Sequence, residues 1–147
     1  MQHNLEKKHI GMFLKNIHKQ VVSGINKELE AFDITLMQSE VLRYIYCRQV
    51  YEDVFQKQIE EYFNSSNPTI TGILKRLEAK GLIKRECSLN DGRYKKLTLT
   101  EKGYEVTKQT FKIGPDKLET KLTKYLSDDE INELKRLLGL VLEGIGE

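Results

Sequence analysis

Residues 66–83 read SNPTITGILKRLEAKGLI, and residues 90–99 read NDGRYKKLTL. Four apolar residues of the first stretch recur at the spacing of one helix face: Ile70, Ile73, Leu74 and Leu77. Pro68 lies in the first turn, where proline is tolerated, and Gly81 follows the last turn, where glycine commonly ends a helix. The spacing therefore predicts a helix over about 67–80.

The second stretch predicts a β-hairpin. Asp91-Gly92 is a strong signal for a tight turn between strands. Leu97 and Leu99 alternate with polar neighbours, as in a half-buried strand. We therefore expect residues 82–89 to pair with residues 94–99.

A short helix is predicted just before residues 66–83. Residues 55–63 carry Ile59 and Phe63 four positions apart, and the polar residues 64–67 follow them. Two short helices joined by a tight polar turn and followed by a hairpin form a winged helix-turn-helix. We therefore expect a mainly α chain with a small β-hairpin wing.

Further helices are predicted on both sides of this unit. Apolar residues at helical spacing mark a buried helix face over about 10–32: Ile10, Leu14, Ile17, Val21, Ile25 and Leu29. Thr35-x-x-Gln38 is a capping box that opens a helix to about Arg48. Thr100 can cap a helix toward Phe111, which Gly114-Pro115 must kink or interrupt.

The last predicted helix begins at a second capping box, Ser127-x-x-Glu130. Its apolar residues share one face: Ile131, Leu134, Leu137, Leu138, Val141, Leu142 and Ile145. A subunit with long amphipathic helices at both ends buries them fully only against each other and a partner, which predicts a homodimer. Packing of the two helices within a monomer is the alternative.

The composition describes one nearly neutral chain of about one domain. The chain has 147 residues, and 24 basic against 22 acidic side chains give a net charge of +2, which by itself indicates neither a nucleic acid nor a membrane partner. Its apolar runs are far shorter than the roughly 18–20 residues that a membrane span needs. The N-terminal residues show no secretory signal pattern, so we expect a cytoplasmic protein without membrane association.

The distribution of charge is more informative than its sum. Residues 75–96 contain eight basic and three acidic side chains, a net +5, so the remaining residues sum to −3. A basic helix and hairpin within a slightly acidic chain is typical of a phosphate-binding surface. An ordinary solvated charged face is the other interpretation.

The side chains on the polar edge of the 67–80 helix suit DNA. They are short hydrogen-bonding groups and one long cation: Ser66, Asn67, Thr69, Thr71 and Lys75. Such groups can reach phosphates and base edges in a major groove about 12 Å wide. Arg93 at the hairpin tip could enter an adjacent minor groove.

These residues resemble the MarR-type transcriptional regulators, and the resemblance extends from the first long helix to the last. Its most specific parts are the 66–80 helix with its Leu-Glu-x-x-Gly-Leu-Ile ending, the Asp91-Gly92-Arg93 wing, and the Leu-Thr-x-x-Gly run at 99–103. The sequence departs from the family at Phe55 and Glu60, where Thr and Ala are usual, and at Gly72, where a larger polar residue is frequent.

The resemblance implies a homodimeric repressor that binds double-stranded DNA at a palindromic operator. Residues 33–100 would form the winged helix-turn-helix, and residues 1–32 with 101–147 the dimerisation region of one intertwined domain. We assign DNA contacts to nine residues: Ser66, Asn67, Pro68, Thr69, Thr71, Lys75, Arg76, Arg93 and Lys95. Asp91 would hold Arg93 through an ion pair. Dimerisation is assigned to Ile10, Leu14, Ile17, Leu134, Leu138, Val141, Leu142 and Ile145.

The family also suggests a pocket for a small aromatic or amphipathic effector, for which we name Phe13, His18, Tyr44 and Tyr46, with core packing as the alternative. Cys47 and Cys87 form no Cys-x-x-Cys pair and are expected to be free thiols. Cys87 lies beside cations of the wing and is a candidate for oxidation in a redox-sensing variant of the regulator. The histidines lack zinc-like spacing, so no metal is expected.

No set of nucleophile, base and acid can be assembled, and no nucleotide-binding, hydrolase or zinc-protease motif is present. We therefore expect neither enzymatic activity nor a cofactor. The remaining alternative to a DNA-binding regulator is a winged protein-interaction module that does not read DNA.

Overall fold

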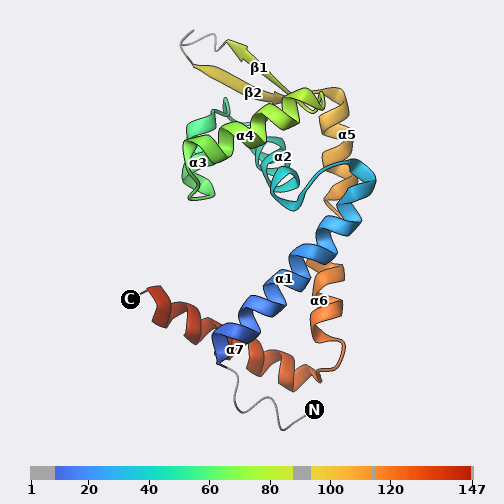
Figure 1. The fold of residues 1–147 in the computed structure, drawn as a ribbon, viewed down its shortest axis with the longest axis vertical. Coiled ribbons are helices and arrows are strands. Elements are labelled where there is room, and N and C mark those ends of the chain that lie inside the picture. The colour runs from blue at the N-terminus through green and yellow to red at the C-terminus, as the bar shows by residue number, and fades with distance from the viewer. Residues whose placement is uncertain (1–8, 88–93, 114, 147) are drawn as a thin grey trace. The chain divides into compact units, whose positions relative to one another are not determined.

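The computed structural model describes residues 9–87, 94–113 and 115–146. Their elements follow in this order (Figure 1): α1 (Ile10–Leu29), the 3-10 turn η2 (Glu30–Phe32), α2 (Leu36–Arg48), α3 (Gln56–Tyr62), α4 (Asn67–Ala79), β1 (Ile83–Cys87), β2 (Lys95–Leu99), α5 (Glu101–Thr110), α6 (Pro115–Thr123) and α7 (Asp128–Gly146). The elements from α1 to α5 pack as one unit, and α6 and α7 form a second one. The mainly helical chain with its antiparallel hairpin confirms the predicted fold class.

The core of the first unit lies where α2, α3, α4 and the hairpin meet. The apolar stripe predicted on α4 is buried in full: Ile70, Ile73, Leu74 and Leu77. It packs in one cluster with Val41, Leu42 and Ile45 of α2, Ile59 of α3 and Leu97 of β2. Because this stripe turns toward the core, the opposite edge of α4 is left to solvent.

The helix starts are capped as the sequence predicts. In the first capping box the Gln38 amide donates to Thr35 Oγ1 over 3.3 Å, and the Thr35 amide donates to Gln38 Oε1 over 3.2 Å. In the second, the Ser127 amide donates to the Glu130 carboxylate over 2.8 Å. That hydrogen bond, together with the one from the Ser127 hydroxyl, lowers the pKa of Glu130.

The hairpin is anchored to the core at β2. Its antiparallel register pairs Ile83 with Leu99 and Arg85 with Leu97. The Leu97 amide also donates to the Val54 carbonyl over 2.7 Å. Strand β1 is described as far as Cys87, and residues 88–89 of the predicted strand lie outside the described residues. The predicted turn at Asp91-Gly92-Arg93 lies outside the described residues.

The end of α4 and the start of α5 are in close contact. Gly81 follows the last turn of α4, as predicted, and its φ of 68° is the left-handed conformation that glycine adopts readily at a helix end. The Thr100 hydroxyl donates to the Gly81 carbonyl over 2.6 Å and accepts from the Gly103 amide over 3.0 Å. A Cβ at position 103 would overlap the backbone carbonyl of Leu82, so only glycine fits there without movement.

The first helix is less buried than its apolar stripe predicts. The helix ends at Leu29, and the 3-10 turn continues to Phe32, where the end was expected. Leu29 is buried, but Ile10, Leu14 and Ile17 are exposed. The sequence pattern marks an apolar face correctly, but the first half of this face remains exposed at these three positions in the described chain.

In the second unit α6 and α7 carry a similar apolar face. Helix α5 ends at Thr110 and α6 begins at Pro115, so the helix is interrupted before Pro115, as predicted. Lys135 Nζ of α7 lies 2.9 Å from Glu119 Oε1 of α6. Four of the five α7 residues assigned to dimerisation are exposed, namely Leu134, Leu138, Leu142 and Ile145, and Val141 is half-buried. None of the described helices combines the length and the hydropathy of a membrane span.

Candidate nucleic-acid interface

The polar edge of α4 carries most of the residues predicted to contact DNA. Six of them are exposed: Ser66, Asn67, Pro68, Thr69, Lys75 and Arg76. Thr71 is half-buried. The Ser66 side chain does not cap the helix, and its hydroxyl lies 2.9 Å from the hydroxyl of Thr69. Polar groups therefore follow one another along the side of α4 that faces away from the core.

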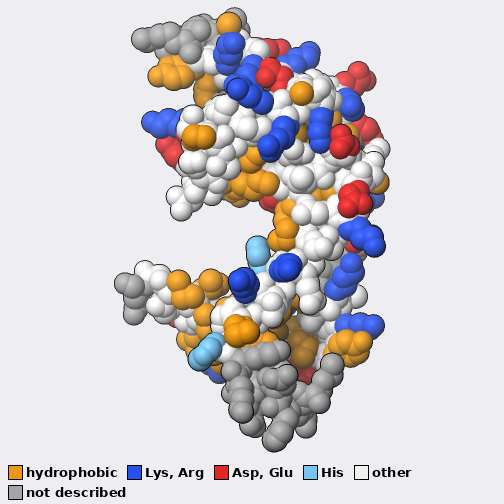
Figure 2. Space-filling view, viewed as in Figure 1, with side chains coloured by type: hydrophobic (Ala, Val, Ile, Leu, Met, Phe, Trp, Pro, Cys, Tyr) orange, Lys and Arg blue, Asp and Glu red, His pale blue; other side chains and the backbone are white. Residues whose placement is uncertain are grey.

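Cations surround this edge. Figure 2 shows Lys and Arg side chains gathered over α4 and the hairpin. Two cations of the hairpin have acidic neighbours: Arg85 Nε lies 3.3 Å from Glu78 Oε2, and Lys96 Nζ lies 3.6 Å from Asp53 Oδ1. Within the described ranges no ion pair is found for Lys75, Arg76 or Lys95, all of which are exposed. These three are the cations best placed to meet phosphates.

A cavity lies between α3, α4 and the hairpin. Its lining combines polar, charged and aromatic side chains: Phe55, Gln56, Lys57, Glu60, Asn67, Thr71, Arg85, Tyr94, Lys95 and Leu97. The structure thus brings three of the predicted DNA contacts, Asn67, Thr71 and Lys95, to one place. Arg85 Nε and Nη2 are buried in this wall and make no hydrogen bond to the described residues, because the contact of Nε with Glu78 is an ion pair without hydrogen-bond geometry.

Four side chains of α3 and α4 form a closed hydrogen-bonded ring beside the cavity. Gln56 Nε2 donates to Glu60 Oε1 over 2.9 Å and to Thr71 Oγ1 over 2.7 Å. Asn67 Nδ2 donates to Glu60 Oε1 over 2.7 Å, and Thr71 Oγ1 donates to Asn67 Oδ1 over 3.5 Å. Each helix supplies two residues four positions apart, the spacing at which side chains share a helix face. We call these four residues the polar ring.

Sequence reasoning missed half of this ring. It named Asn67 and Thr71, and it noticed Glu60 only as a departure from the family pattern. Gln56 was not singled out, although its spacing of four from Glu60 on a short helix was the available signal. Arg85 was considered only for its charge. Its place in the lining of the cavity could not be predicted, because its burial depends on how the hairpin packs.

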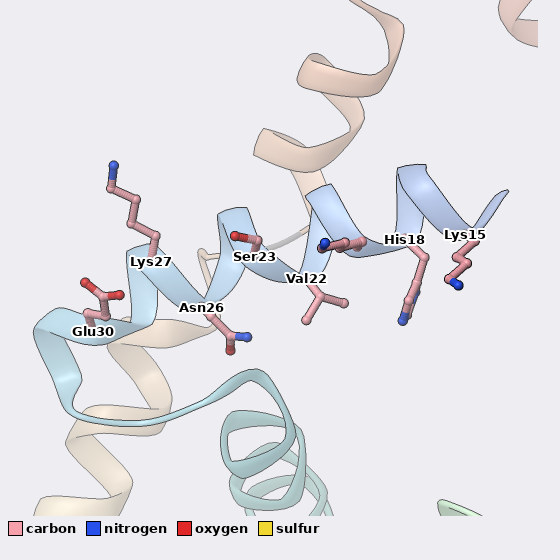
Figure 3. Close-up of a pocket in the computed structure, with 8 residues that line it drawn as sticks. Lys15, His18, Val22, Ser23, Asn26, Lys27 and Glu30 are labelled. Atoms are coloured by element: carbon pink, nitrogen blue, oxygen red, sulfur yellow. The ribbon is translucent and has the colours of Figure 1, made fainter. Parts of the chain in front are cut away.

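The four residues named for an effector pocket have different neighbours in the described chain. The Tyr44 ring lies 4.7 Å from the Tyr62 ring, whereas the Tyr46 ring lies 4.8 Å from the Tyr104 ring. His18 lines an open pocket along α1, shown in Figure 3. Six of its labelled residues belong to that helix and the seventh, Glu30, begins the 3-10 turn η2; the six are Lys15, His18, Val22, Ser23, Asn26 and Lys27. Phe13 is half-buried on the same helix. The assignment of these residues to an effector stays a prediction.

Other predicted site residues are placed only in part. Arg93 and Asp91 lie outside the described residues. Cys47 and Cys87 are both exposed free thiols, and Cys87 stands opposite Lys95 in the hairpin register. The described residues contain no group of three or more His, Cys, Asp or Glu side chains that could hold a metal ion.

Comparison with known proteins decides the family. The sequence model of the MarR family matches residues 34–95. The chain is 33% identical over 147 residues to the HTH-type transcriptional regulator MgrA of Staphylococcus aureus, and the match covers 99% of this chain and 95% of MgrA. The chain belongs to the MarR family.

Solved structures of the MarR family share the fold. The MepR–DNA complex of S. aureus has a TM-score of 0.81 and 28% identity, covering 94% of this chain and 99% of MepR. A mutant of Escherichia coli MarR in complex with operator DNA has a TM-score of 0.76 and 28% identity, covering 90% of this chain and 93% of MarR. This MarR-family chain is therefore a winged-helix transcriptional regulator and not an enzyme.

Proposed function

We propose that this MarR-family chain binds double-stranded DNA as a homodimer and represses transcription from a palindromic operator in the cytoplasm. The observation that carries the proposal is the exposed polar edge of α4, flanked by the exposed cations Lys75, Arg76 and Lys95. A helix that buries one face in the core and presents such an edge has the arrangement of a recognition helix. The DNA complexes of MepR and MarR support this assignment.

The interface divides into groups that position the protein and groups that read sequence. Lys75, Arg76 and Lys95 carry full charges and would contact phosphates, which supply affinity without sequence information. Asn67 and Thr71 are neutral, and their groups match the donors, acceptors and methyl groups of base edges. Arg93 remains assigned to an adjacent minor groove on sequence grounds.

The homodimer is supported by the apolar faces that the chain leaves uncovered. Ile10, Leu14 and Ile17 of α1 are exposed, as are most of the apolar residues on one face of α7. Several large apolar side chains in a row are unusual on the surface of a monomer and mark an interaction site. A second copy of the chain covers both faces in this proposal, and two recognition helices then reach successive major grooves about 34 Å apart.

Release of the operator is assigned to a small aromatic or amphipathic effector. A ligand weakens DNA binding only if it favours an arrangement of the dimer that fits the operator less well. Phe13, His18, Tyr44 and Tyr46 remain the residues proposed for its site. The pocket on α1 that His18 lines also carries Lys15, Lys19 and Lys27, which would favour an anionic effector.

The test is selection of duplex DNA from a random pool by the purified protein. The expected result is an inverted repeat whose half-sites are centred about 10 base pairs apart, with affinity that falls steeply as salt rises. Selection of no sequence, combined with weak binding to all duplexes, would overturn the proposal. That result would favour the alternative, a winged module that contacts another protein.

A further inference from the structure

We propose that Glu60, a residue of α3, is a positioning residue for base recognition because it orients the amide of Asn67 on α4. This inference rests on the proposed DNA binding and adds a residue to its mechanism. It is carried by the polar ring, in which Glu60 Oε1 accepts from both Asn67 and Gln56. Glu60 is half-buried beside the cavity between α3, α4 and the hairpin.

The carboxylate decides which end of the Asn67 amide faces α3. An ionised carboxylate only accepts hydrogen bonds, so the group of Asn67 that meets it must be the NH₂. The Asn67 Oδ1 is then turned toward Thr71, whose hydroxyl lies 3.5 Å away. An alanine at position 60, which the family usually has, could not impose this orientation.

Asn67 and Thr71 keep some hydrogen-bonding groups that the polar ring does not use and that can contact DNA. Asn67 Nδ2 uses one hydrogen on Glu60 and keeps one, and Oδ1 keeps one lone pair. One donor next to one acceptor is the pattern that pairs with N7 and N6 of adenine in the major groove. The Thr71 hydroxyl accepts from Gln56 and donates to Asn67, so Thr71 offers its methyl group and one lone pair. We therefore expect an adenine preference at the base pair that faces Asn67.

The negative charge of Glu60 has an effect that is separate from positioning. A carboxylate near the phosphates of a bound duplex weakens binding to every sequence, because like charges repel. Glu61 carries the same charge on the same helix, but it is exposed and takes no part in the polar ring. Changes at Glu61 therefore control for charge.

The experiment measures base preference at each position of the selected duplex by competition binding. Asn67→Ala first identifies the base pair whose preference depends on Asn67. In Glu60→Ala the preference at that same base pair is expected to fall about fivefold or more. This is the lower end of the discrimination against a wrong base that one bidentate contact provides. Glu60→Gln is expected to keep most of it, because its amide oxygen still accepts from Asn67, and Glu61→Ala is expected to keep all of it.

A second variant keeps the test usable if Glu60→Ala does not fold. Glu60→Asp preserves the charge but withdraws the carboxylate by one methylene, so the same preference should fall while salt dependence stays unchanged. The positioning role would be overturned if Glu60→Ala and Glu60→Asp both keep the preference at the Asn67-dependent base pair within about twofold of wild type. Wild-type protein that prefers no sequence would overturn the proposed function itself, which is a distinguishable result.

Discussion

Lys95 and Lys96 are neighbours on β2, yet their surroundings differ. Consecutive side chains of a strand point to opposite faces, so the two ammonium groups leave the hairpin in different directions. Lys96 Nζ lies 3.6 Å from Asp53 Oδ1 and its side chain is 24% exposed. Lys95 is exposed at the rim of the cavity beside α4. A cation that is already paired with a carboxylate of the protein contributes less to the binding of a phosphate than an unpaired cation does.

At the residue scale we predict that Lys95→Ala weakens binding to all duplexes alike. Removal of one phosphate contact should reduce the slope of log K against log salt concentration by about 0.9. The matched change Lys96→Ala should alter that slope much less. Titrations of the selected duplex and a scrambled one at several salt concentrations provide the measurement. Equal slope changes for the two variants, or weakening confined to the selected duplex, would refute the assignment of Lys95 to a phosphate.

At the scale of elements, two helical glycines have opposite surroundings. A Cβ at Gly72 of α4 would meet no atom within 4 Å, so the glycine there only weakens the helix. A Cβ at Gly103 of α5 would overlap the Leu82 carbonyl, which belongs to the segment between α4 and β1. The same residue type therefore costs stability in one helix and permits close packing in the other.

For these elements we predict that two glycine-to-alanine variants change the free energy of unfolding in opposite directions. Gly72→Ala should raise the free energy of unfolding by about 1 kcal/mol, the difference in helix propensity between the two residues. Gly103→Ala should lower it by about 2 kcal/mol or more, since backbone must move to admit the methyl group. Urea unfolding at one fixed protein concentration measures both, because assembly would otherwise change the apparent stability. A shift of the same sign in both variants would contradict this explanation.

Contacts between residues that are close in the sequence could be predicted, whereas contacts between residues far apart in the sequence could not. The capping boxes at Thr35 and Ser127 and the glycine stop at Gly81 were predictable, because each involves residues within a few positions of one another. Two of the four bonds of the polar ring were not, because they cross between α3 and α4. The hairpin was predicted from its turn, but the burial of Arg85 depends on the docking of the strands.

At the scale of the whole molecule, apolar faces remain on α1 and α7. Burial of one large apolar side chain contributes about 1.5–3 kcal/mol, so a row of exposed ones favours association. Along α7, Leu138 lies on the face assigned to the interface, and Leu140 lies two residues further, on nearly the opposite side of the helix. Both side chains are exposed in the described chain, at 39% and 53%.

We predict that Leu138→Lys dissociates the proposed homodimer, because it would place a charge in an apolar contact. Leu140→Lys carries the same change on the other side of α7 and should leave the assembly intact. Sedimentation over a range of protein concentrations measures the mass of each variant. An unchanged dimer with Leu138→Lys, or equal dissociation by both variants, would argue against this face as the interface.

The register of β2 links the stability of the hairpin to its proposed contact with DNA. Lys95, Leu97 and Leu99 share one face of the strand, so the pairing that buries Leu97 also places Lys95 beside α4. A slip by one residue would turn all three away together. Under the proposed function, we expect substitutions that disrupt the packing of Leu97 and substitutions that remove Lys95 to share one phenotype, the loss of repression. The surface proposed to bind DNA thus also depends on Leu97, a buried residue that is not assigned to any DNA contact.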